Sequence, residues 1–158
     1  MLNPWLHLTA LVIYLGSLTS LWLILLPALG IIKSHEERLL LLARSLKLYN
    51  PLQIGVLGVL VLLGAFQITE LKSVYREFFI KELGMTLGWK LVVSFVLILL
   101  STYQSMGVAH RFVRRYEGGD GFLAEEDRSL SQRLRISTLL ILPLALIAVW
   151  LGLRLRGG

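Results

Sequence analysis

The chain has 158 residues, of which 56% are hydrophobic and only 16% are charged. A soluble domain of this size could not bury so much apolar surface, so the composition excludes an ordinary soluble globular protein and predicts membrane spans. The formal charge of +6 lies between the apolar runs, where it suits lipid headgroups and not nucleic acid. The absence of cysteine excludes disulfides, thiolate metal sites and covalently attached haem.

Leucine-rich stretches predict a single all-α transmembrane domain over residues 1–158, a four-helix bundle with short amphipathic connecting helices. We expect spans at about 4–31, 50–71, 86–109 and 134–153. No lysine or arginine precedes the first apolar run, which favours a retained first helix over a cleaved signal peptide.

Capping residues set the expected helix starts. Asn3–Pro4 and Asn50–Pro51 each combine an N-cap residue with a proline suited to the first turn, and Thr86 is a candidate cap for the third span. Pro143 lies inside the fourth span and predicts a kink there.

The connections differ in charge. The first, "SHEERLLLLARSLKLY", predicts an amphipathic surface helix that leads into the second span, and the third, "HRFVRRYEGGDGFLAEEDRSLSQRLR", is the most solvated part of the chain. With Lys33 these two connections hold ten lysines and arginines, whereas the second connection and the C-terminus hold five. The positive-inside rule therefore predicts a bacterial-type inner membrane location with both termini outside the cytoplasm.

This orientation places three polar side chains at one depth. His7 lies three residues into the first span and Lys90 four residues into the third, which is about 5–6 Å at the helical rise. Gln67 precedes the outer end of the second span by a similar amount. A histidine, a lysine and a glutamine from three helices are therefore expected in one layer of the outer leaflet.

Helical periodicity puts each of these residues on a stripe with other polar or small side chains. One stripe consists of Lys90, Ser94, Ser101 and Ser105, and the other of His7, Ala10, Tyr14 and Ser17. Polar stripes in membrane helices usually face the bundle interior. Gly55, Gly58 and Gly64 make the second span slim, so that a neighbouring helix or a flat ligand can approach its backbone.

Each feature also has a plainer interpretation. Lys90 lies close enough to the membrane surface to snorkel, and His7 alone is typical of an interfacial histidine. Gln67 suits a hydrogen bond between helices, and serines are common at helix contacts. Met85 near His7 suggests soft copper ligation, but the chain has only three methionines.

The segment "WLHLTALVIYLGSLTSLWLILLP" resembles the first span of HemJ-type protoporphyrinogen oxidases, in which a Leu-His pair precedes a helix with a central glycine and a late proline. "RSLKLYNP" is similar to the lead into that family's second span, and "GWKLVVSFVLILLSTYQ" to its third. The CopD-like copper-resistance membrane domains share this general four-helix pattern. The resemblance covers most of the chain and rests on few identities.

The resemblance implies a b-type haem and the oxygen-independent oxidation of protoporphyrinogen IX, with a histidine and a lysine essential at the positions of His7 and Lys90. Both residues would then be metal ligands, and Tyr14 and Gln67 would lie near the cofactor. Haem propionates would need cations at the outer surface, for which Lys72, Arg76 and Lys81 are available. The chain departs from the family at Gln104, where a histidine is common, and in lacking the Asn-Glu pattern of the fourth span.

Three functions follow as hypotheses. The first is a haem-binding redox protein, either an oxidase acting on a porphyrin substrate or an electron carrier. The second is a non-catalytic small subunit of a larger respiratory or photosynthetic membrane complex, or a homo-oligomer. The third is CopD-like copper handling, against which the lack of cysteine and the few methionines and histidines count.

Overall fold

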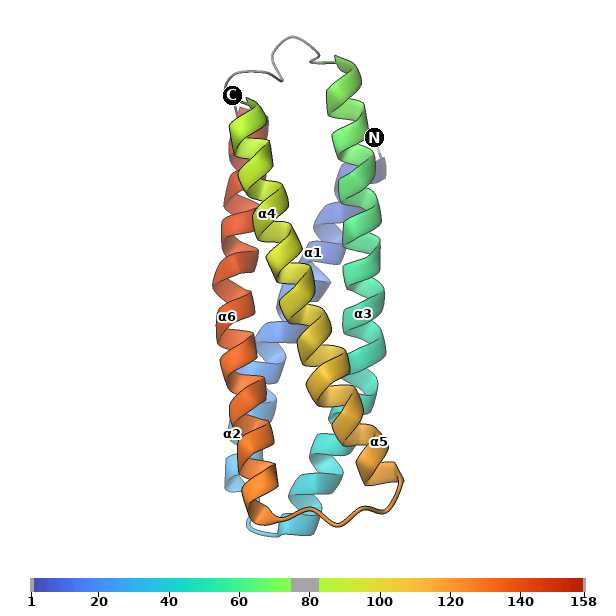
Figure 1. The fold of residues 1–158 in the computed structure, drawn as a ribbon, viewed down its shortest axis with the longest axis vertical. Coiled ribbons are helices and arrows are strands. Elements are labelled where there is room, and N and C mark those ends of the chain that lie inside the picture. Colours follow the sequence, from blue (N-terminus) through green and yellow to red (C-terminus); the bar gives the residue numbers. More distant parts are fainter. Residues whose placement is uncertain (1, 75–82, 158) are drawn as a thin grey trace.

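The computed structural model describes residues 2–74 and 83–157, which form four long helical rods (Figure 1). The first rod consists of α1 (Leu2–Ser20), the π-helical turn η1 (Leu21–Leu25) and α2 (Leu26–Ile31), and the second is α3 (His35–Val74). The third consists of α4 (Leu83–Thr102), the π-helical segment η3 (Tyr103–His110) and α5 (Arg111–Glu117), and the fourth is α6 (Ala124–Gly157). The predicted all-α four-helix bundle is confirmed, and the described residues include no strand.

The rods alternate in direction, so the two termini lie at the same end of the bundle (Figure 1). We call this the termini end; it also holds the end of α3 and the start of α4. The opposite, connection end holds the turn 32–34 and the turn 118–123. Gly119 has a φ of +78° in the second turn, a left-handed conformation that glycine adopts without strain.

Two helix pairs make up the termini end. α1 packs mainly on α3 and α4 mainly on α6, whereas towards the connection end η3 and α5 pack on α3 (Figure 1). α1 and α4 are therefore diagonal helices that cross near the middle of the bundle. This crossing brings together residues that the two pairs otherwise keep apart.

The outside of the bundle is apolar. Val12 is 69% exposed, Phe95 62% and Leu146 59%, and each of the four spans buries only 22–28% of its most apolar stretch inside the chain. Such surfaces would be costly in water, and helices satisfy their backbone hydrogen bonds internally as lipid requires. The four helices are long and apolar enough to cross a membrane, and the chain is a multi-pass membrane protein.

The first connection differs from the prediction. The stretch predicted as a surface helix is the first part of α3, which runs unbroken from His35 to Val74. Its apolar residues Leu39, Leu42 and Leu46 are buried, and their spacing continues through Tyr49 and the span beyond. One inward stripe thus makes one helix of about 60 Å, longer than the apolar core of a bilayer.

Several predicted helix starts differ from those in the structure. Asn50 does not cap a helix and Pro51 lies inside α3, because the stripe holds both sides of the proline against the bundle. Thr86 lies inside α4, and α6 begins ten residues before position 134, at Ala124. Pro143 lies within α6 as expected, and Pro27 follows the π-helical turn η1 in the first rod.

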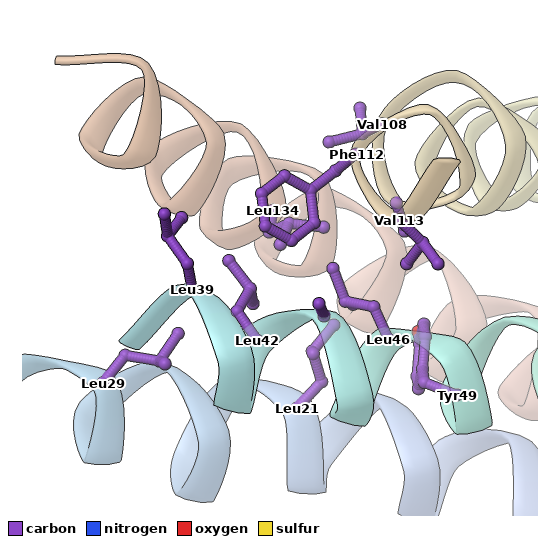
Figure 2. Packing of buried hydrophobic residues seen from close by; sticks show 12 residues of the cluster. Leu21, Leu29, Leu39, Leu42, Leu46, Tyr49, Val108, Phe112, Val113 and Leu134 are labelled. Carbon is purple, nitrogen blue, oxygen red and sulfur yellow. The ribbon is translucent and has the colours of Figure 1, made fainter. Parts of the chain in front are cut away.

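All four rods contribute to an apolar core at the connection end (Figure 2). Leu21 and Leu29 come from the first rod, and Leu42 and Leu46 from α3. The aromatic ring of Phe112 from α5 meets them beside Leu134 of α6, as Figure 2 shows. These side chains join all four rods at the connection end.

An ion pair fixes the starts of α3 and α6 to one another. The carboxylate of Asp127, whose side chain is 1% exposed, lies 3.2 Å from Nη1 of Arg38 and 3.8 Å from Nδ1 of His35. Arg38 also donates to the carbonyl of Ile32, and Nε2 of His35 lies 3.1 Å from the carbonyl of Phe122. The cluster thus ties both turns of the connection end to α3 and α6.

We predict that Asp127→Asn lowers the free energy of unfolding by about 3 kcal/mol, because it leaves the Arg38 guanidinium partly buried without its carboxylate. Glu117→Gln is the matched control, since it breaks an exposed pair with Lys47 and should cost less than about 1 kcal/mol. Thermal unfolding in detergent measures both. Equal losses would contradict a structural role for the buried pair.

The excess of basic residues at the connection end predicts that this end faces the cytoplasm. The chain lacks cysteine, so single cysteines report their location without background. A membrane-impermeant maleimide added to intact cells should label Arg154→Cys, an exposed position at the termini end, and should label Gly121→Cys only after the membrane is opened. The reverse pattern would show that the positive-inside rule fails for this chain.

Candidate functional site

The two predicted polar stripes face the bundle interior. On α1, Ala10 and Tyr14 are buried and His7 and Ser17 are half-buried. The stripe on α4 and η3 behaves in the same way, with Ser101 and Ser105 each 1% exposed. Lipid thus meets the apolar sides of both helices, and the polar sides meet other helices.

The Lys90 side chain lies against α6. Its Nζ is 3.4 Å, and its Cε 3.7 Å, from the position that a Cβ atom would take at Gly152. Leu87 and Leu97, which share its face of α4, are buried. Lys90 therefore lies on the inner side of α4, and glycine at position 152 gives the amine room beside the α6 backbone.

The structure places His7 and Lys90 at the same end of the bundle, as the depth argument predicts. His7 belongs to the α1–α3 pair and Lys90 to the α4–α6 pair. Tyr14 lies seven residues beyond His7, about 10 Å further along α1, in a different layer.

The other side chains predicted near the cofactor lie outside the described part of the chain. The backbone of Gln67 is in α3, one turn beyond Gly64, but its side chain lies outside the described residues, as does that of Lys72. Arg76 and Lys81 also lie outside the described residues. The proposed propionate partners therefore remain predictions.

Small side chains lie among the buried leucines of the inner faces towards the termini end. Ala10 and Ala145 are buried, and Ser94 and Ala148 are half-buried. Gly64 has no atom within 4 Å of its Cβ position. Leu87 and Leu97 are buried on the same side of α4. Small residues either let membrane helices approach closely or leave room for a bound group.

An open groove runs between α4 and α6 at the termini end. Its walls are formed by Met85, Thr86, Trp89, Val93, Ile147, Trp150, Leu151 and Arg154. The guanidinium carbon of Arg154 lies 4.7 Å from the centre of the Trp150 ring. Tryptophan and arginine at the end of a span are typical of the membrane interface, where this groove would accept an acyl chain or a flat amphiphile.

A second group of polar side chains lies deeper in the bundle, and we call it the polar belt. Its members are Tyr14, Ser17, Tyr49, Asn50, Gln53, Ser101, Gln104, Ser105 and Thr138. Every member except the half-buried Ser17 is buried. All four rods contribute to the belt, so hydrogen-bonding side chains extend across the whole bundle at this level.

The first part of the belt joins α1 to its diagonal partner. The hydroxyl groups of Tyr14 and Ser101 are hydrogen-bonded across the bundle. One turn along α1, Ser17 donates to Oε1 of Gln53 on α3 at 2.6 Å. Three rods are therefore linked where α1 and α4 cross.

The second part is centred on Gln104, which is fully buried in η3. Its amide nitrogen donates to the hydroxyl of Thr138 on α6 at 2.7 Å, and its oxygen lies 3.5 Å from the hydroxyl of Tyr49 on α3. Gln104 and its neighbour Ser105 both lie in a π-helical segment, a widened turn that often occurs at functional sites. Gln104 is thus the centre of a hydrogen-bond network that joins α3, η3 and α6.

Helical periodicity predicted the inward direction of Tyr14, Ser17, Ser101 and Ser105, but it did not point to the α3 members of the belt or to Thr138 of α6. The available signal was the register of α3, because Gln53 occupies an inward position between the buried residues Tyr49 and Leu57. The second predicted span began at about residue 50, which separated Gln53 from the inward residues Leu42, Leu46 and Tyr49 of the same helix.

The comparisons with known proteins give no neighbour. No family model, no curated protein and no solved structure matches this chain. The fold and surface define the class of protein, a multi-pass four-helix membrane bundle. Among the described residues no three histidines or carboxylates come together as a metal site.

We predict that Tyr14→Phe lowers the free energy of unfolding by about 1 kcal/mol, because Ser101 loses its partner inside the bundle. Ser101→Ala should cost a similar amount, and the double variant should cost little more than either single one. Tyr103→Phe is the matched control. Tyr103 and the nearby Met106 are both exposed on the lipid side, so removing the Tyr103 hydroxyl should not change the free energy of unfolding. Additive effects of Tyr14 and Ser101 would contradict the diagonal contact.

Proposed function

We propose that this protein binds a b-type haem between its transmembrane helices at the termini end, with His7 and Lys90 as ligands, and that the haem gives it a redox role. The observation that carries the proposal is the position of Lys90 on the inner face of α4, with its amine beside Gly152 of α6. A lysine kept inside a membrane bundle marks a functional site by default, because burying its charge is costly.

The residues present fit such a group in two respects. Imidazole and a free amine are both nitrogen donors that haem iron accepts. The inner faces near Lys90 carry alanine, serine and glycine, which give a flat macrocycle access to helix backbones. His7 and Lys90 come from different helix pairs, so a group held by both would also join α1 to α4.

The chemistry supplied by a bound haem is one-electron transfer at its iron. The chain's own residues would have three tasks. His7 and Lys90 would hold the iron, the apolar spans would exclude water from the macrocycle, and Arg154 at the termini end would offer a cation to its carboxylates. An oxidase of the HemJ type would take protoporphyrinogen IX as its substrate and pass the electrons to a separate acceptor, whereas an electron carrier would accept electrons from one partner and pass them to another.

A second function, as a non-catalytic subunit of a larger membrane complex, is favoured by a different observation. Gly55 and Gly58 are exposed on the outer side of α3, and no atom lies within 4 Å of either Cβ position. Small residues on the outside of a membrane helix suit close contact with another helix. A homo-oligomer would use the same face.

Absorption spectra of the purified protein test the proposal. We expect a reduced-minus-oxidised b-type signal that is lost in His7→Ala and in Lys90→Met, because each variant removes one ligand. His110→Ala and Lys47→Met are matched controls at the connection end and should keep the signal, since both residues are exposed there.

The opposite results would overturn specific parts of the proposal. A signal retained in both His7→Ala and Lys90→Met would remove these residues as ligands. A protein that purifies without haem and only together with other chains would favour the subunit function, for which Gly58→Leu should weaken the association.

A further inference from the structure

Three buried polar atoms of the belt have no hydrogen-bond partner within the described part of the chain. They are Oδ1 of Asn50, Nε2 of Gln53 and Oγ of Ser105. Their residues are 6%, 1% and 1% exposed. Ser17 occupies the oxygen of the Gln53 amide, and the Tyr14 hydroxyl lies close to the same amide without a well-directed bond to its nitrogen.

These atoms flank the hydrogen bonds of the belt. Asn50 and Gln53 are one helical turn apart on α3, next to Tyr49. Ser105 follows Gln104 in η3, the segment that packs on α3, and lies one turn beyond Ser101. The unpartnered atoms thus sit on the two helices that the Tyr49–Gln104 contact joins.

The chemistry of the three atoms identifies the missing ligand. Asn50 offers an acceptor, Gln53 offers a donor, and a serine hydroxyl is both. Water is the smallest molecule that donates and accepts at once, and buried waters typically make two to four such bonds. An ion is a poor match, because no charged side chain belongs to the belt.

Charged side chains approach the belt from the connection end. Exposed charged residues occur only three positions from its members, at Lys47 before Asn50 and at Arg135 before Thr138. Three helical residues correspond to about 5 Å. Water that solvates these charged groups would therefore pass about one turn of helix to reach the belt.

We propose that the polar belt holds ordered water inside the membrane-spanning bundle, bonded to Asn50, Gln53 and Ser105. The water links the Tyr14–Ser101 part of the belt to the Tyr49–Gln104 part, so that a continuous hydrogen-bonded path crosses four rods. This inference does not rest on haem binding, because none of the belt's unpartnered atoms belongs to His7 or Lys90.

Radiolytic hydroxyl-radical footprinting of the full chain in lipid nanodiscs tests the proposal, because radicals formed at bound water oxidise the side chains beside it. We expect oxidation of Tyr14 and Tyr49 well above that of Phe112, although all three are at most 8% exposed. Phe112 is the matched control, since its neighbours form the apolar core of the connection end. Equal protection of all three rings would overturn the proposal.

A pair of serine variants gives a second readout. Ser105→Ala should lower the midpoint of thermal unfolding by several degrees, because it removes a partner of the water. If the Ser105 hydroxyl has no ligand, its removal should instead raise the midpoint. Ser129→Ala, an exposed serine of α6, gives the baseline. An organic molecule retained in native mass spectra and lost in Ser105→Ala would replace water as the ligand and also overturn the proposal.

Discussion

Polar groups inside a bilayer must find their partners within the protein, and this constraint shapes the whole bundle. Lipid offers no hydrogen bond, so backbone groups are satisfied within helices and polar side chains turn inward. The outward sides of the rods are therefore apolar, and the inward sides of α1 and α4 carry the polar stripes. The contact between Tyr14 and Ser101 is where the two stripes meet, at the crossing of the diagonal helices.

The two ends of the bundle are held together by different side chains. Large apolar side chains and the Asp127–Arg38 pair hold the connection end together. Towards the termini end, alanine, serine and glycine lie among buried leucines such as Leu57 and Leu97, and His7 and Lys90 lie on the same sides of their helices. The polar belt lies between the two, and it connects all four rods without using the residues of the proposed haem site.

Much of the fold could be predicted from the sequence, since length and apolarity alone specify membrane spans. The inward direction of the stripes also followed from helical periodicity. The start of α3 did not, because Asn50–Pro51 has the pattern of a cap while the apolar spacing on both sides of it favours one helix. The partners of Gln104 and Gln53 could not be predicted either. They depend on which helices are diagonal, and a single sequence does not contain that order. The ligand roles of His7 and Lys90 stay predictions.

The most direct measurement of the central claim is cross-linking, by a short bifunctional thiol reagent, of cysteines introduced at positions 14 and 101. The chain has no cysteine of its own, so any cross-link arises from this pair. If the polar faces of α1 and α4 meet across the bundle, Tyr14→Cys with Ser101→Cys should be joined by a reagent that spans the length of the tyrosine side chain they replace. Val12→Cys with Leu99→Cys, whose native side chains are 69% and 55% exposed, should not. Cross-linking of the second pair and not the first would contradict the arrangement on which the belt and the proposed haem site both depend.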